Sequence, residues 1–161
     1  MDCRERLNWS LALLLAFWAS GCGTGRIEPP RKEDVKKIME ISVQHFDKVE
    51  QVKYPWGWIR WLMNSKLDPG AAQTFGVVEI AAGQRNSLHM HPNCEELLYV
   101  LSGSCKHRIG DKSVVLKPGD IARIPAGVAH QAILLGNEPM RAVISYSSGD
   151  RQVVDLGPGK E

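Results

Sequence analysis

Two histidines and a nearby carboxylate are the residues of this chain best suited to chemistry. His89 and His91 lie two positions apart in a segment without helical periodicity. Successive side chains of an extended strand point to opposite faces, so both imidazoles are expected on the same face. Pro92 and Asn93 then break the strand, and the β-rich run that contains Glu96 can return alongside it. The imidazole pair is half of a metal site, and the carboxylate can extend it.

A fourth ligand has to come from another part of the chain, and His130 is the candidate. It follows the turn signal Pro125 to Gly127, which ends one short strand and opens another over Gln131 to Leu135. Two other histidines, His45 and His107, stand alone, and a lone histidine is more often a surface or core residue than a ligand.

Two segments of the chain resemble the signature motifs of the cupin superfamily. The first motif has Gly83, five residues, His89, one residue, His91, four residues, Glu96, six residues and Gly103. The second has Gly119, five residues, Pro125, one residue, Gly127, two residues and His130. The family's second motif closes with an Asn that is not a metal ligand, and this chain has Leu134 there. The resemblance covers Thr74 to Tyr146.

The resemblance implies an all-β fold, a single small antiparallel barrel of the jelly-roll type. It also implies that His89, His91, Glu96 and His130 are the ligands of one divalent metal ion. Three imidazoles and one carboxylate are borderline-to-hard donors, which suit iron, manganese, zinc, nickel or cobalt, and no thiolate is present to select copper(I). A six-coordinate metal would keep two positions open for substrate, water or dioxygen.

Substrate contacts are predicted from the parity of the histidine strand. Arg85 and Ser87 share parity with His89, so a regular strand would point both at the same cavity. Arg85 would then bind a substrate carboxylate by a two-pronged contact; the alternative is that it lies on the rim and faces water. Tyr99 has the opposite parity to Glu96 and is expected to point outward.

The first residues are expected to direct export and are not read as part of the fold. An apolar run from Leu11 to Trp18 is followed by small residues and Cys22, a secretory signal pattern too short for a permanent membrane span. The segment resembles a bacterial lipoprotein signal, which implies cleavage before Cys22 and lipidation of that thiol; an ordinary signal peptide is the alternative. We therefore assign 1–21 to the signal peptide and 22–30 to a lipidated tether, with the protein held at the cell envelope and facing the periplasm or exterior.

Residues 31–72 are predicted to form an extension that packs on the barrel. Its first part, 31–49, has apolar residues at helical spacing and is predicted to be an amphipathic helix. Its second part holds Trp56, Trp58 and Trp61, of which the first two share a face in an extended chain. These rings could line a ligand mouth, although closure of one barrel end is the more frequent role of such a cluster.

The remaining chain divides into the barrel, 73–150, and a C-terminal tail, 151–161. Short β-rich runs separated by turn signals continue from Phe75 to Tyr146, which favours a barrel or sandwich. The tail is expected to hold a short strand at most. Cys94 and Cys105 bracket one strand and should lie too far apart to form a disulfide.

Several function classes follow from these patterns. The net charge of +2, with scattered Lys and Arg, argues against a nucleic-acid partner. The leading prediction is an envelope-anchored, metal-dependent cupin that acts on a small oxygen-rich molecule as a dioxygenase, decarboxylase, lyase or isomerase. Two alternatives remain: a non-catalytic sensor that binds a small molecule, and a metal-stabilised structural protein of the envelope. A homodimer is expected by analogy with the family.

Overall fold

The computed structural model describes residues 42–159, in which the regular secondary structure is almost entirely β-strand. A 3-10 turn, η1 (Phe46–Lys48), precedes the first strand. The strands are β1 (Gln51–Tyr54), β2 (Gly57–Met63), β3 (Thr74–Ile80), β4 (His89–Met90), β5 (Glu96–Ser102), β6 (Ser104–Ile109), β7 (Lys112–Leu116), β8 (Ile121–Ile124), β9 (His130–Leu135), β10 (Met140–Tyr146) and β11 (Val154–Asp155).

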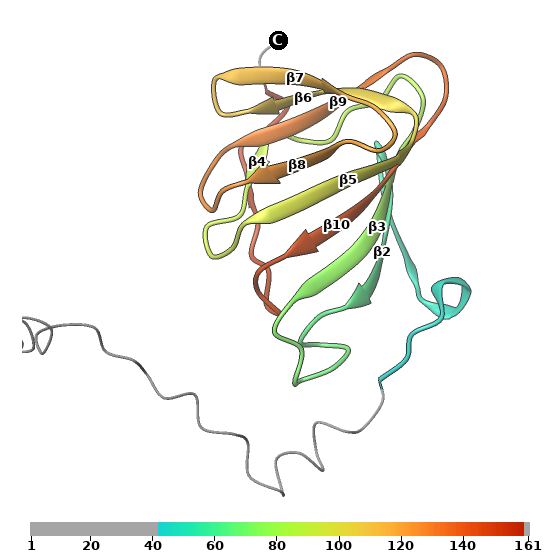
Figure 1. Cartoon of the computed structure of the whole chain (residues 1–161), viewed down its shortest axis with the longest axis vertical. Coiled ribbons are helices and arrows are strands. Elements are labelled where there is room, and N and C mark those ends of the chain that lie inside the picture. The colour runs from blue at the N-terminus through green and yellow to red at the C-terminus, as the bar shows by residue number, and fades with distance from the viewer. Residues whose placement is uncertain (1–41, 160–161) are drawn as a thin grey trace, which may run out of the picture. The chain divides into compact units, whose positions relative to one another are not determined.

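Six of these strands form one antiparallel sheet in the order β1-β2-β3-β10-β5-β8. The central strand β10 pairs with β3 along its full length, from Met140 opposite Ile80 to Tyr146 opposite Thr74. On its other side β10 pairs with β5, which brings Tyr146 opposite Glu96. Figure 1 shows β2, β3, β10, β5 and β8 lying side by side in this order.

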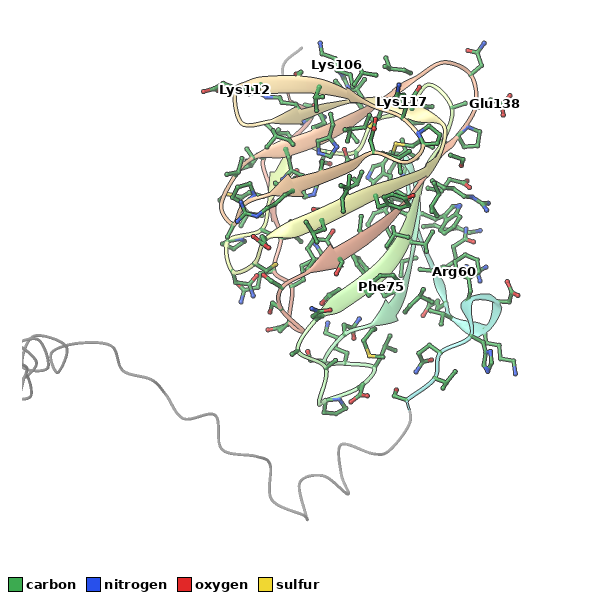
Figure 2. All side chains as sticks on the ribbon, in the orientation of Figure 1. Arg60, Phe75, Lys106, Lys112, Lys117 and Glu138 are labelled. Carbon is green, nitrogen blue, oxygen red and sulfur yellow. The ribbon has the colours of Figure 1, made fainter. Side chains whose placement is uncertain are left out.

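The other five strands form a second antiparallel sheet in the order β11-β4-β9-β6-β7. Strand β4 is only two residues long, and it pairs with β9 at His89 opposite His130 and with β11 at Asp155 opposite His89. The edge strand β7 carries or adjoins lysines at Lys112 and Lys117, and Lys106 lies on its neighbour β6 (Figure 2). Charged side chains of this kind protect an exposed edge strand from pairing with another chain.

Buried residues of both sheets form one hydrophobic core, with members on β5 and β10 of the first sheet and on β6 and β9 of the second. In β5 the residues at Glu96, Leu98 and Val100 are buried while their neighbours are exposed, and β10 alternates in the same way. This period of two is what a strand with one face on the core requires. The metal-ligand candidates therefore lie on the inner faces of two different sheets.

Two expectations about the architecture need correction. The two sheets are not joined into a closed barrel among the described residues, because β1 and β8 on one sheet and β7 and β11 on the other remain edge strands. No α-helix occurs in residues 42–159. Within the predicted helix 31–49, the described residues form no helical structure beyond η1, and Val43 and Phe46 of its apolar stripe are exposed. A short helix needs a buried face for stability; residues 31–41 lie outside the described part.

Across the described residues we find no helix with the length and apolarity that a membrane crossing would require.

Candidate metal centre

Four side chains from the two sheets converge on one point. His89 lies on β4, His91 directly follows that strand, Glu96 begins β5 and His130 begins β9. One ligand atom from each residue lies within 4.8 Å of the others. The Nε2 atoms of His91 and His130 are each 3.1 Å from Oε2 of Glu96. The set predicted from the sequence is therefore assembled in space.

Backbone carbonyls orient all three imidazoles in the same way. Nδ1 of His89 lies 2.8 Å from the carbonyl oxygen of Ser87, and Nδ1 of His130 lies 2.9 Å from that of Val128. Nδ1 of His91 lies 2.7 Å from the carbonyl oxygen of Gln152, in the C-terminal tail. A carbonyl can only accept, so each Nδ1 carries a proton, and in the neutral ring Nε2 is the nitrogen that holds the lone pair. This arrangement fixes the tautomer that a metal ligand needs.

The buried Glu96 sets the charge of the site. Burial alone would raise the pKa of this carboxyl, but the imidazoles of His130 and His91 beside it outweigh burial and hold the pKa well below its ordinary value. Burial acts to lower the pKa of His130, but its hydrogen bond to Glu96 prevails and raises it. Burial lowers the pKa of His89 to about 4, and the nearby His130 adds to this. Glu96 is therefore an anion, and His89 is neutral, at neutral pH.

The residues fit a resident metal ion. Nε2 of His91 is buried and makes no hydrogen bond among the described residues, although it lies 3.1 Å from Oε2 of Glu96. A buried nitrogen without a partner is costly, and so is a buried carboxylate. A cation between them satisfies both, and three nitrogens with one carboxylate match the preferences of first-row transition metals. The four side chains thus form a site for one divalent transition metal ion.

The site opens into a cavity of about 220 Å3 between the sheets. His89 and Glu96 belong to its wall, so a metal held by them would face the cavity. Much of the remaining wall is apolar, with Ile59, Val78, Ile80, Leu98, Met140 and Ile144. The volume is below the ~300–1,000 Å3 of pockets for drug-sized ligands, so the cavity suits a small molecule.

The two predicted substrate contacts lie in different places. Ser87 lines the cavity and also supplies the carbonyl that orients His89. Arg85 is exposed, forms an isolated bridge with Ile133 and is not among the residues that line the cavity. The regular strand assumed for residues 85–90 is formed only at His89 and Met90, so parity does not carry over to Arg85. Its role in substrate binding stays a prediction.

The tryptophans and cysteines also have defined places. Trp56 stacks on Tyr54 at 4.8 Å between ring centroids, and both rings line the cavity. Trp58 instead donates a hydrogen bond to Glu79. Cys94 and Cys105 are both buried free thiols, which confirms that they do not pair. Burial raises the pKa of each thiol, so neither is a reactive thiolate.

Three residues that were not predicted from the sequence take part in the site. Tyr146 is buried against the ring of His91 at 4.8 Å between centroids. Burial, followed by the charge of Glu96, raises the pKa of Tyr146, so the phenol stays protonated. Arg151 and Asp155, from the segment expected to be a tail, line the cavity. The only local sequence pattern near Arg151 and Asp155 is the apolar pair at 153–154. That pair indicates a short strand but does not predict which strand it pairs with.

Comparison with known proteins agrees with this architecture. Residues 76–146 match the family model described as a cupin domain. An uncharacterised protein of Methanocaldococcus jannaschii is 25% identical over 122 residues, which are 73% of this chain and 98% of that protein. Protein SchB of Streptomyces halstedii is 30% identical over 104 residues, which are 65% of this chain and 75% of SchB.

A solved structure extends the comparison to the fold. The oxalate decarboxylase of Lactobacillus farciminis, in a formate complex, superposes with a TM-score of 0.65 at 23% identity. The match covers 70% of this chain and 35% of the decarboxylase chain, so this chain spans about a third of that enzyme. At this level of identity the likeness concerns the fold.

Proposed function

We propose, from the premise that this chain belongs to the cupin superfamily, that it is a metal-dependent enzyme acting on a small oxygen-rich molecule. The reaction would be of the dioxygenase, decarboxylase, lyase or isomerase type. One observation carries the proposal: His89 and Glu96 belong both to the metal-ligand set and to the wall of a cavity of about 220 Å3. A ligand in that cavity can therefore approach the metal directly.

The residues around the cavity have separate tasks in such a reaction. When bound, the divalent metal supplies Lewis acidity that polarises an oxygen of the substrate. His89, His91 and His130 hold their Nε2 lone pairs ready, because three backbone carbonyls fix their tautomers. The protonated phenol of Tyr146 can donate a hydrogen bond but cannot serve as a base near neutral pH. The apolar wall limits the water that reaches the reacting groups.

Elemental analysis tests the metal part of this proposal. The purified full chain should carry close to one transition metal ion per chain, and His91→Ala should lose most of it because a ligand is removed. His45→Ala changes an exposed histidine outside the ligand set and should retain the metal. Equal metal content in wild type and His91→Ala would refute the site.

Turnover assays test the enzymatic part. Iron-loaded protein is mixed with small carboxylic and hydroxy acids while dioxygen consumption and products are followed. Metal-dependent product formation that His91→Ala abolishes supports an enzyme. Saturable ligand binding without any product supports the sensor alternative instead. That alternative is favoured because the cavity wall offers few groups for acid–base catalysis. Its titratable residues other than the ligands are Tyr54, Tyr146, Arg151 and Asp155. Unfolding on metal removal, with no ligand found, supports the structural role.

The proposal also includes a location at the cell envelope, and its support is the sequence of residues 1–30, which lie outside the described part. Lipidation at Cys22 would anchor the protein by acyl chains. Expression in a bacterial host with a radiolabelled fatty acid tests this. Wild type and Cys3→Ser should incorporate label, and Cys22→Ser should not; label retained by Cys22→Ser would refute the anchor.

A further inference from the structure

Arg151 brings a positive charge to the wall of the cavity. Its guanidinium lies 4.7 Å from the ring centroid of Trp61 and 5.1 Å from that of Tyr146. The amide of Asn93 fixes the chain on both sides of it: Nδ2 donates to the carbonyl of Asp150 at 2.7 Å, and Oδ1 accepts from the N–H of Gln152 at 3.0 Å. The backbone on both sides of the arginine is therefore fixed, and its guanidinium lies against two aromatic rings.

The guanidinium has no anionic partner among the described residues. No carboxylate within residues 42–159 forms an ion pair with it. Its Nη1 lies 3.4 Å from Nδ1 of His91. That nitrogen already donates its hydrogen to the carbonyl of Gln152 at 2.7 Å, so it has no lone pair for Arg151. Arg151 thus presents free N–H donors to the cavity beside the metal ligands.

The charges and the surface of the cavity indicate which anion would fit. A divalent cation and Arg151 would supply one positive charge more than the carboxylates of Glu96 and Asp155 remove. A single negative charge balances that excess, whereas a dianion would exceed it. The planar fork of Arg matches a carboxylate. The apolar wall and the stacked pair Tyr54 and Trp56 then call for an apolar body attached to that group.

We propose that the cavity takes a monocarboxylate with an apolar body, and that Arg151 binds its carboxylate group. This inference names the substrate class of the site under Proposed function and rests on that function. Small dicarboxylates such as oxalate, which fit the charge of the cavity poorly and leave its apolar wall uncovered, are expected to bind weakly. Arg151 lies beyond residues 76–146, which match the family model, so this specificity belongs to the C-terminal segment.

Ligand binding to the manganese-loaded full chain tests the proposal. Benzoate serves as the monocarboxylate, benzamide as a neutral molecule of nearly the same shape, and oxalate as the dianion. Binding is followed by calorimetry and by tryptophan fluorescence, since Trp56 lines the cavity and Trp61 contacts Arg151. Wild type should bind benzoate more tightly than benzamide and oxalate by about tenfold or more, the usual effect of one charged hydrogen bond.

Matched arginine variants assign the effect. Arg151→Met keeps an apolar side chain against the rings and should weaken benzoate binding by about tenfold to a hundredfold. Arg151→Lys keeps the charge without the planar fork, and its affinity for benzoate should lie between those of wild type and Arg151→Met. Arg141→Met is the control, because Arg141 also lies over a tryptophan ring, Trp58 at 5.4 Å, but pairs with Glu79 and does not line the cavity.

The outcomes separate this inference from the proposed function. Metal content, measured on the same samples, should be equal in wild type and Arg151→Met. Absence of saturable benzoate binding, equal binding of benzoate and benzamide, or unchanged binding in Arg151→Met would each overturn the role of Arg151 even if the metal is present. Benzoate binding that depends on Arg151, without turnover of any acid, would uphold the inference and remove the enzymatic function.

Discussion

His107 is a buried imidazole with no hydrogen-bond partner for either ring nitrogen among the described residues. Its ring lies nearly parallel to that of His130, at 6.0 Å between centroids. Burial lowers the pKa of His107 from its ordinary value of 6.5 to about 4, against the opposing effect of Glu96. The ring is therefore neutral at neutral pH, and the core of the fold contains an unpaired polar group. This agrees with the expectation that a lone histidine is a surface or core residue.

Replacement of His107 should change how stability depends on pH. The pKa of His107 is lower in the folded than in the unfolded chain, so the unfolded chain takes up the proton first as pH falls. Its contribution is complete above pH ~6.5 and declines toward pH ~4, by at most about 3 kcal/mol. His107→Leu should remove this decline and, at neutral pH, leave the free energy of unfolding equal or raised by about 1 kcal/mol.

Urea unfolding at pH values on either side of 6.5, the ordinary value for His107, makes the measurement. His45→Leu changes an exposed histidine and should behave as wild type. If wild type and His107→Leu lose the same free energy between the two pH values, this account of His107 is wrong.

At the same scale, the ligands and the anion-binding residue differ in how well the sequence predicts them. His89, His91 and Glu96 lie close together in sequence, and strand parity with the cupin motif predicts their convergence. Arg151 reaches the site because Asn93 holds the chain around it, and no local pattern encodes that contact. Long-range docking of an irregular segment is set by tertiary packing.

The turn between β5 and β6 depends on a glycine that passes close to another strand. Gly103 has φ +69°, and a Cβ there would lie 2.7 Å from the Cα of Met140 and from the carbonyl oxygen of Pro139. Gly83 has nearly the same backbone conformation, φ +72°, but a Cβ there would meet no atom within 4 Å. Both glycines belong to the first motif, but only at Gly103 would a Cβ also collide with a neighbouring strand.

The two glycines therefore form a matched pair for mutation. Gly83→Ala should cost about 1–2 kcal/mol, the strain of a left-handed conformation. Gly103→Ala should cost more than about 3 kcal/mol, because backbone of β10 must also move. Urea unfolding of both variants measures the difference, and equal losses would show that the close approach at Met140 has no energetic effect.

The position of the C-terminal segment affects the metal site. Asn93→Ala removes both hydrogen bonds that hold Asp150 and Gln152, and thereby loosens the carbonyl that orients His91. Metal affinity should fall by about tenfold, as for other residues that orient a ligand. Competition with a chelator measures it. Asn137→Ala, at an exposed residue away from the site, is the control, and an unchanged affinity in Asn93→Ala would contradict the orienting role.

Secondary structure was predicted best where burial alternates. The β-rich runs expected to continue as far as Tyr146 do end there, with strand β10, in which alternate residues are buried. The strand expected over Arg85 to Met90 is shorter, since Arg85 keeps only an isolated bridge. The apolar spacing in 31–49 predicted a helix, and this prediction is wrong at its C-terminal end, where Val43 is exposed rather than buried against the protein.

At the scale of the whole molecule, the six-stranded sheet has an apolar outer face. Leu97, Tyr99 and Leu101 alternate outward on β5, and Ile121 lies opposite Tyr99 on β8. Tyr99 points outward, as its parity predicts. Phe75 is exposed on β3 of the same sheet (Figure 2). Exposed apolar patches on soluble proteins often mark contact surfaces, which supports the expected homodimer.

Light scattering after size exclusion tests the dimer. Wild type should elute with the mass of two chains, and Tyr99→Lys combined with Ile121→Lys should elute as one, since two charges would be buried at the contact. Val115→Lys, at an exposed residue of β7 in the other sheet, should leave the dimer intact. A wild type that stays monomeric at high concentration would refute the dimer.

The peptide between Arg151 and Gln152 joins the two halves of the site. The carbonyl of Gln152 orients His91, while the guanidinium of Arg151 faces the cavity. A carboxylate that immobilises Arg151 would also immobilise the group that steadies the metal ligand. By thermodynamic linkage the cation and the anion must then raise each other's affinity by the same factor, so retention of the metal becomes a measure of how full the cavity is.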